Sequence, residues 1–377
     1  MQNVMRIGIP KETYQGEKRI ALAPQGVDTL VKAGHSVFIE TNAGVESHFT
    51  DEEYRKVGAN IVYNPEEAYQ RAEMLVKIAP LSENEIDLLE EEQIVFSFQH
   101  LAIGKRNQIE KLLKKKITAI AYELIEKNDQ LPVLQSMSEI AGQLSIQIGE
   151  RFFGSDIPGS RGILIGGIPG VAPAAVVIIG AGVVGYTAAQ AAYSRGAHVI
   201  VLDKDLRRLR RIETNISKNI TTVAANEYTI ARGVKFADLL IGAVQMKAEK
   251  APHLVTEEMV KTMKKGAVIV DVSIDQGGCI ETSRPTTFTD PVFIEHDVIH
   301  YCVPNMPALV PRTATYGLTN ASIEYIKEIA DNGLSNALLG DVGLAKGVCT
   351  YNGFVSNENI AEVFSFEYRR LHIFSKN

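Results

Sequence analysis

The segment AVVIIGAGVVGYTAAQAAYSRGAHVIVLD, residues 175–203, decides the fold of this chain. It opens with an apolar run, 176–179, which predicts a buried strand. Three glycines follow in the spacing GxGxxG and lead directly into an alanine-rich stretch, which predicts a helix. A second apolar run, 198–202, ends at Asp203. This succession of strand, glycine turn, helix, strand and acid is typical of a Rossmann unit that binds a dinucleotide.

Each part of the fingerprint has a physical role. Gly180 permits a tight turn, Gly182 lets the backbone approach a pyrophosphate, and Gly185 lets the helix pack closely on the strand. The helix N-terminus offers N–H groups and a partial positive charge to the same pyrophosphate. Asp203 lies 18 residues after Gly185, where a carboxylate accepts hydrogen bonds from the adenosine ribose. It would repel a 2′-phosphate, so we predict NAD rather than NADP as the cofactor.

The bulk composition limits the class of protein. With 377 residues the chain is too long for one ordinary core and suits two domains. Hydrophobic residues make up 45% and charged residues 22%, as in an average globular protein. The net charge of −6 argues against a nucleic-acid partner. The sequence has no signal-peptide pattern and no apolar stretch long enough for a bilayer, so we expect a cytoplasmic location and no membrane partner.

Short β-branched runs alternate with amphipathic stretches through most of the chain, which predicts an α/β fold. We expect two Rossmann-like domains, each with a doubly wound parallel sheet. The expected strands are 6–10, 36–40, 74–78, 94–98, 117–122, 176–179, 198–202, 239–244, 267–272 and 298–303. Two long helices are expected, one beginning near Ser136 and one over 315–331. The glycine-rich segment 159–174 is expected to be a loop that packs near the cofactor.

Several polar residues lie just after expected strands, where doubly wound sheets place their functional groups. His100 follows the run 94–98, and its natural pKa near neutrality suits proton transfer. Asp275 follows the run 267–272 and precedes two glycines. Arg19 could grip a carboxylate with two parallel hydrogen bonds. From position alone, a structural histidine, a turn-capping aspartate and a surface arginine explain these residues as well.

Segments spread over nearly the whole chain resemble the alanine dehydrogenase family. These segments are RIGIPKE, KRIALAP, GHSV, HLA, MSEIAGQLSIQIG, GGIPGV, VIIGAGVVGY, DVSIDQGGCIETSRPTT, YCVPNMPALVPRT and LTNA. The resemblance implies a reversible, NAD-dependent oxidative deamination of L-alanine to pyruvate and ammonium. It also implies a homohexamer, and a discontinuous catalytic domain, residues 1–133 and 312–377, around an NAD-binding domain, residues 134–311.

The resemblance also implies roles for individual residues. Arg19 would hold the substrate carboxylate, His100 would donate or accept a proton at the substrate carbon, and Asp275 would activate water. We expect the cofactor to contact Ser138, Gly180, Gly182, Val183, Val184, Gly185, Asp203, Arg208, Val244, Val272, Asn305 and Met306.

One segment departs from the family pattern. The family typically has Lys-x-Lys-Glu-Pro, whose second lysine binds the substrate carboxylate, whereas this chain has KIAPL over residues 77–81. Lys77 matches the first lysine, and Ala79 stands in place of the second. Loss of a charge-assisted hydrogen bond costs about 1.5–3 kcal/mol. Alanine therefore binds weakly, Lys77 substitutes as the substrate-binding residue, or the substrate differs.

Two other functions therefore stay open. The 77–81 segment resembles the NAD-binding subunit of proton-translocating transhydrogenase, although such subunits lack counterparts of His100 and Asp275. An opine- or saccharopine-type reductase, which couples an amine to a 2-oxo acid, is the other alternative. Some alanine dehydrogenases bind magnesium near the position of Glu328, with a histidine one turn later. Asn332 stands at that place, so we predict no metal.

Overall fold

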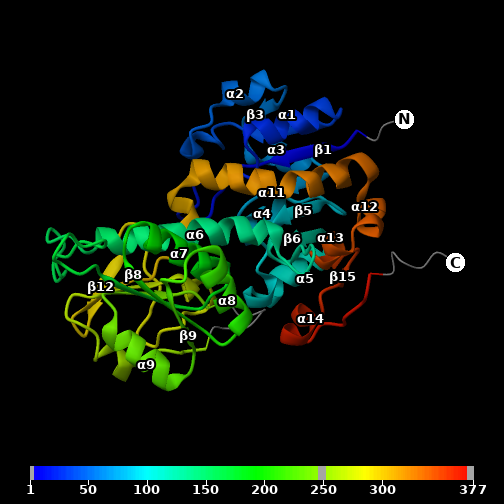
Figure 1. Cartoon of the computed structure of the whole chain (residues 1–377). Coiled ribbons are helices and arrows are strands. Elements are labelled where there is room, and N and C mark those ends of the chain that lie inside the picture. Colours follow the sequence, from blue (N-terminus) through cyan, green and yellow to red (C-terminus); the bar gives the residue numbers. More distant parts are fainter. Residues whose placement is uncertain (1–3, 245–251, 372–377) are drawn as a thin grey trace. The chain divides into compact units, whose positions relative to one another are not determined.

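The structure is a computed structural model that describes residues 4–244 and 252–371. The chain forms two compact units (Figure 1). The first comprises Met1–Met137 and Ala308–Asn377, and the second comprises Ser138–Pro307. Each unit is built on a mainly parallel sheet connected by helices, which confirms the predicted class of two doubly wound α/β units.

The sheet of the first unit has the order β15-β14-β6-β5-β4-β1-β2-β3. Strands β1 to β6 are parallel and run 3-2-1-4-5-6 across the sheet, the winding of a Rossmann fold, while β14 and β15 form an antiparallel edge. The strands are β1 Arg6–Ile9, β2 Ser36–Glu40, β3 Asn60–Val62, β4 Met74–Val76, β5 Ile94–Ser97, β6 Thr118–Ala121, β14 Val348–Tyr351 and β15 Phe354–Val355.

Helices connect these strands, and the long helix α11 packs against α1. The helices of the first unit are α1 Pro24–Lys32, α2 Asp51–Lys56, α3 Pro65–Gln70, α4 Glu83–Leu88, α5 Arg106–Lys114, α11 Pro311–Asn332, α12 Leu334–Gly340, α13 Val342–Lys346 and α14 Glu358–Phe364, with the 3₁₀ turns η1 Val45–Ser47, η2 Leu101–Ile103 and η3 Tyr122–Leu124.

The sheet of the second unit has the order β12-β13-β11-β10-β7-β8-β9. Its six parallel strands repeat the winding of the first sheet, and only β12 is antiparallel. The strands are β7 Ala175–Ile179, β8 His198–Asp203, β9 Thr221–Ala224, β10 Leu239–Gly242, β11 Val268–Asp271, β12 Val292–Glu295 and β13 Val298–Tyr301. In Figure 1 the helices α7 and α9 lie on opposite faces of this sheet.

The helices of the second unit are α7 Val183–Ser194, α8 Leu206–Asn215, α9 Glu227–Phe236 and α10 Glu257–Val260, with the turns η4 Val272–Gln276 and η5 Met306–Leu309. The helix α6, Pro132–Arg151, contains the division between the two units. The two long helices were expected, but each begins four residues before its expected start, and both start at a proline. Proline is suited to the first helical position because the N–H that it lacks has no partner there.

The central strands are buried along their whole length, because helices cover both faces of a doubly wound sheet. Every residue of β5, β6, β7, β10, β11 and β13 is buried. Because both faces of these strands are buried, the sequence runs that predicted them are mainly apolar. The helices bury one face each, as α5 does with Ile109 and Leu112.

The glycine-rich segment 159–174 is a loop, as predicted, with a single antiparallel bridge between Ile168 and Val171. The prediction that it packs near the cofactor is wrong. A Cβ on Gly166 would lie 2.4 Å from the carbonyl oxygen of Arg195, which caps the C-terminal end of α7. The segment enters β7 at the amino edge of the sheet, whereas the glycine fingerprint leaves β7 at the carboxyl edge.

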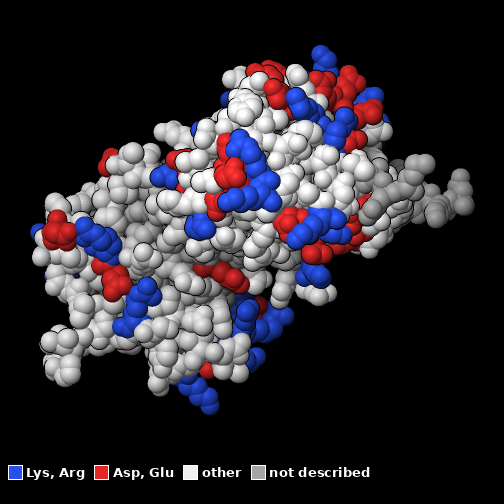
Figure 2. Space-filling view, turned by 90° about the horizontal axis from the view of Figure 1, so that it is seen from above, with Lys and Arg blue, Asp and Glu red and all other residues white. Residues whose placement is uncertain are grey.

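Neither sign of charge dominates the surface that Figure 2 shows. On the face seen in Figure 2, acidic and basic side chains are interspersed. Within the described residues, no helix combines the length and apolar character needed to cross a bilayer.

Candidate active site

The glycine fingerprint forms the turn between β7 and α7. Gly180 has φ +103°, and a Cβ there would lie 2.3 Å from the carbonyl oxygen of Ala243. A Cβ on Gly185 would lie 1.8 Å from the carbonyl oxygen of Gly180. Both positions therefore require glycine. This geometry bears out the turn and packing roles expected of the two residues.

The N-terminus of α7 is suited to an anionic ligand. Gly182 is the N-cap residue, and no side chain caps the helix. The first turn, which begins with Val183 and Val184, contains no acidic residue. This turn lies between β7 and β10, where the winding of the sheet reverses and where doubly wound sheets bind their ligands. The residues present therefore fit the pyrophosphate of a dinucleotide.

Asp203 is the last residue of β8 and is buried. Its Oδ2 accepts a hydrogen bond from the backbone N–H of Ala181 at 2.6 Å, and its Oδ1 accepts one from Asp205 at 2.7 Å. Arg208 Nη1 lies 3.7 Å from Oδ2. Each carboxylate oxygen has two lone pairs, so the Asp203 carboxylate can still accept hydrogen bonds from the ribose hydroxyls. The structure thus brings Asp203 and Arg208 together beside the glycine turn.

Helix α6 lies directly on the start of α7. A Cβ on Gly142 would lie 2.6 Å from the carbonyl oxygen of Val184. Ser138 is one turn earlier in α6 and is half-buried. The expected cofactor residue Ser138 therefore belongs to the helix that contacts the fingerprint.

Five further expected residues follow neighbouring strands of the same sheet. Asp275 lies in η4 after β11, and its Oδ1 accepts a hydrogen bond from the backbone N–H of Asn305 at 2.9 Å. Val244 follows β10, and its N–H donates to Oγ of Ser273 at 2.9 Å. Val272, at the start of η4, is half-buried, and Met306 is buried. The structure thus connects the ends of β10, β11 and β13 by hydrogen bonds.

In the first unit the winding reverses between β1 and β4, so the residues after these strands mark its candidate ligand site. Glu12 follows β1, and Lys77 follows β4. Lys77 Nζ lies 3.0 Å from Glu12 Oε2 and 2.8 Å from Glu85 Oε1, and its side chain is 1% exposed. Glu12 also accepts a hydrogen bond from the N–H of Ile78 at 2.6 Å. The predicted substrate residue Lys77 is therefore enclosed by two carboxylates.

Burial and charge act in opposite directions on this cluster. Burial alone would lower the pKa of Lys77, but the attraction of Glu12 and Glu85 outweighs it and raises that pKa. Burial raises the pKa of Glu12, against the attraction of Lys77. The pKa of Glu85 is lowered, because Lys77 and the hydrogen bonds from Ser82 outweigh its desolvation. Lys77 is therefore charged, and it is the cation that compensates the buried carboxylates.

Arg19 is buried and held by Glu17 through two hydrogen bonds. Arg19 Nε donates to Oε1 at 2.7 Å and Nη2 donates to Oε2 at 2.5 Å. Nη1 lies 3.2 Å from the sulfur of Met137. Glu17 thus fixes the plane of the guanidinium. Arg19, Glu17 and Glu12 line one small hollow after β1.

His100 follows β5, as expected, and has a left-handed backbone with φ +46°. Glu123 stabilises this conformation by accepting hydrogen bonds from the backbone N–H groups of His100 at 2.7 Å and Gln99 at 3.3 Å. The ring of His100 stacks on Phe98, and its Nδ1 lies 3.6 Å from Glu123 Oε1. The imidazole is 47% exposed and can reach a ligand.

The sequence analysis missed the carboxylates that hold these groups. His100 was identified because it is a polar residue just after an expected strand. Glu123 directly follows the expected strand 117–122, so the same criterion would have identified it. Glu17 stands two residues before Arg19. In the ranges 4–244 and 252–371, no three His, Cys, Asp or Glu side chains gather as they would around a metal ion. Glu328 accepts a hydrogen bond from Asn332 at 2.8 Å.

Comparison with known proteins places the chain in a family. Two family models match, "Alanine dehydrogenase/PNT, N-terminal domain" over residues 8–141 and "Alanine dehydrogenase/PNT, C-terminal domain" over residues 145–358. The chain belongs to the alanine dehydrogenase/PNT family. Within this family, the alanine dehydrogenase of Methanococcus maripaludis is 46% identical over 367 residues, which are 97% of this chain and 98% of that protein. The alanine dehydrogenase of Mycobacterium tuberculosis is 44% identical over 358 residues, 95% of this chain and 96% of the other.

Two solved structures show a similar fold. A structure of L-alanine dehydrogenase is 44% identical, with a TM-score of 0.91, and the match covers 96% of this chain and 99% of that one. The transhydrogenase of Sinorhizobium meliloti is 22% identical, with a TM-score of 0.80, over 94% of this chain and 99% of that one. This second likeness shows the fold alone.

Proposed function

We propose that this protein is an alanine dehydrogenase, which converts L-alanine, NAD and water into pyruvate, ammonium, NADH and a proton. The observation that carries the proposal is the 42–46% identity to alanine dehydrogenases over nearly the whole chain. The dinucleotide turn, His100, Asp275 and Arg19 agree with it. When bound, NAD accepts the hydride from the α-carbon of alanine. All other roles fall to the backbone and side chains of this chain.

The first unit supplies the groups for the substrate. We propose that Arg19 binds the alanine carboxylate, with its guanidinium oriented by Glu17. His100 exchanges a proton with the substrate, and Glu123 fixes its backbone. Lys77 is a second candidate for the carboxylate, and binding it would require the ammonium to leave Glu12 or Glu85.

The second unit supplies the groups for the cofactor and for water. We propose that the start of α7 binds the pyrophosphate and that Asp203 binds the ribose. Asp275 serves as the base that activates water for hydrolysis of the imine formed by oxidation. The hydrogen bond from Asn305 holds its carboxylate at the end of the sheet.

The proposal is tested by following NADH formation from L-alanine and NAD, and its consumption with pyruvate and ammonium. We expect turnover in both directions, which would also show that Ala79 is tolerated. The reverse reaction is repeated with an amino acid in place of ammonium, because an opine- or saccharopine-type reductase would require that amine. A protein that binds NADH but turns over neither alanine nor pyruvate would contradict the proposal and favour a transhydrogenase-like role.

Replacing Asp203 by alanine is expected to weaken NAD binding by about 10- to 100-fold, since hydrogen bonds to a charged group contribute about 1.5–3 kcal/mol. Asp297, on an exposed turn of the same unit, provides the control, and Asp297→Ala should leave the affinity unchanged. Titration of NADH fluorescence measures both. Equal affinities for the Asp203 variant and the wild type would remove Asp203 from the ribose site.

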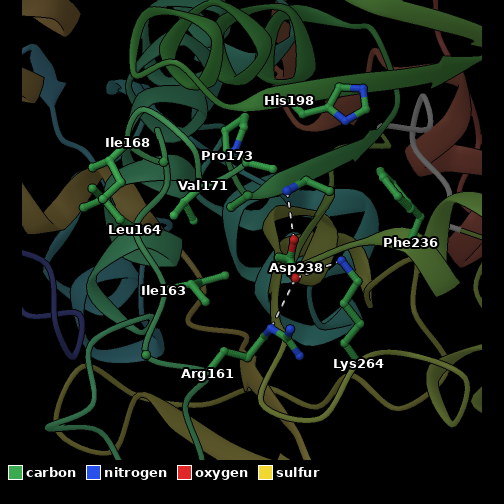
Figure 3. Close-up of a pocket in the computed structure, with 15 residues that line it drawn as sticks. Arg161, Ile163, Leu164, Ile168, Val171, Pro173, His198, Phe236, Asp238 and Lys264 are labelled. Atoms are coloured by element: carbon green, nitrogen blue, oxygen red, sulfur yellow. Dashed lines mark hydrogen bonds and ion pairs between the residues drawn. The ribbon is translucent and has the colours of Figure 1, made fainter.

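We propose that the chain acts as a homo-oligomer, and the family resemblance suggests a hexamer. Four of the exposed large apolar side chains of the second unit lie on one surface, namely Leu164 at 61%, Ile168 at 60%, Val171 at 60% and Phe236 at 45%. They line a pocket of about 640 Å³ at the amino edge of the sheet (Figure 3). Exposed apolar groups gathered in this way are characteristic of surfaces that meet another protein.

The base of this pocket holds one carboxylate that is paired with two cations. Figure 3 shows Arg161 and Lys264 pointing toward Asp238 from two sides, at 3.2 and 2.9 Å. Its apolar walls thus surround a neutralised carboxylate. The substitution Ile168→Asp is expected to lower the mass measured by light scattering while leaving NADH affinity unchanged. Tyr63→Asp alters an exposed side chain of the first unit and should not change the mass. An unchanged assembly in the Ile168 variant would remove this surface from the interface.

A further inference from the structure

Asp271 is a buried carboxylate at the carboxyl end of β11, and it bonds to both ends of the loop that carries Asp275. Its Oδ1 accepts a hydrogen bond from the N–H of Ser273 at 3.0 Å, and its Oδ2 accepts one from the N–H of Cys279 at 3.0 Å. The residue is 1% exposed. Asp275 lies between Ser273 and Cys279 in the sequence.

The surroundings of Asp271 are shaped around its carboxylate. A Cβ on Gly242 would lie 2.7 Å from Asp271 Oδ1, and a Cβ on Gly278 would lie 2.9 Å from Oδ2. Side chains at these two positions would therefore displace the carboxylate. Burial raises the pKa of Asp271, and the Ser283 hydroxyl together with the N–H groups of Cys279 and Ser273 opposes that shift. The chain retains a desolvated acid here, which is costly unless it is well hydrogen-bonded.

The same loop is connected to its two neighbouring strands. Ser273, whose N–H bonds to Asp271, accepts a hydrogen bond from the N–H of Val244 after β10. Asp275 accepts one from Asn305 after β13. A displacement at Asp271 would therefore move the Asp275 carboxylate and its contact to Asn305 together.

We propose that Asp271 is a positioning residue for this enzyme, which fixes the Asp275 carboxylate by holding Ser273 and Cys279. This inference rests on the proposed function, because it requires Asp275 to act in the reaction. The loop η4 is one short 3₁₀ turn followed by two glycines with positive φ, so it has little structure of its own to hold it. The two hydrogen bonds to Asp271 supply that restraint.

The decisive experiment is a double-mutant cycle between the two aspartates. Asp271→Asn preserves the volume but loses one acceptor, and we expect kcat to fall about 10- to 100-fold, since a small misplacement of a catalytic group has this effect. The KM for alanine and the affinity for NADH should stay within about twofold. In an Asp275→Asn background the same substitution should lower the residual kcat by less than about twofold. An equal loss in both backgrounds would show a general structural role and overturn the proposal.

A control and a second readout separate this inference from the proposed function. Asp297→Asn alters an exposed acid of the same unit, at the opposite edge of the sheet just before β13, and should leave kcat unchanged in both backgrounds. Amide hydrogen exchange at Ser273 and Cys279 needs no turnover, and we expect it to be at least about tenfold faster in Asp271→Asn than in the wild type. Unaltered exchange would overturn the inference, whereas a wild type without alanine turnover would overturn the function alone.

Discussion

Replacing His100 by alanine is expected to lower kcat by about 100- to 10,000-fold, the usual contribution of a general acid–base group. The backbone N–H of His100 is held by Glu123, and its ring is half-exposed after β5. The substitution removes the proton donor, and the only packing that it removes among the ring contacts described above is the stacking on Phe98. Steady-state assays of NADH formation measure the loss, and NADH affinity should stay near the wild-type value because the fingerprint belongs to the other unit.

The exposed His253 provides a matched control for this experiment. His253→Ala removes the same side chain from a surface position and should leave kcat unchanged. If the His100 variant keeps more than about a tenth of the wild-type kcat, proton transfer through this residue is too small a contribution for the role that we assign to it.

Replacing Lys77 by methionine is expected to cause the largest loss of stability. The methionine would leave Glu12 and Glu85 buried without their cation, and removing one partner of a buried ion pair typically costs about 3–5 kcal/mol. For a domain of this size that loss lowers the thermal midpoint by roughly 10 °C. Circular dichroism during heating measures the midpoint.

Two further variants locate the cause of the destabilisation. Lys111→Met breaks an exposed pair with Asp87 and should hardly change the midpoint, since solvent screens such pairs. Glu12→Gln added to Lys77→Met removes one of the two stranded charges and should restore part of the loss. A midpoint that Lys77→Met leaves unchanged would mean that the carboxylates become protonated or solvated at little cost.

The long buried strands could be predicted from the sequence because two covered faces require uninterrupted apolar runs. The strands that the sequence analysis missed lie at or near sheet edges or are very short. Thr221–Ala224, for example, has no buried residue, and Phe354–Val355 has only two residues. Such strands form because a neighbouring strand offers hydrogen bonds, and this support leaves little trace in a local pattern.

In the candidate site, residues that follow a recognisable strand could be predicted, whereas contacts between distant segments could not. His100 and Asp275 could be predicted because each follows a recognisable strand. The pairing of Glu12 with Lys77 could not, because the residues are 65 positions apart and meet only through the adjacency of β1 and β4. The role of Asp271 could not be predicted either, since nothing in its local sequence shows that it bonds to both ends of a loop.

The shared winding of the two sheets has a consequence for how this protein can diverge. In the second sheet the winding reverses beside β7. The turn after β7 presents backbone amides, so few single substitutions can change what binds there. At the equivalent turn of the first sheet, side chains such as Glu12 and Arg19 face the hollow. Point mutations can therefore alter substrate choice over evolution while the cofactor stays constant.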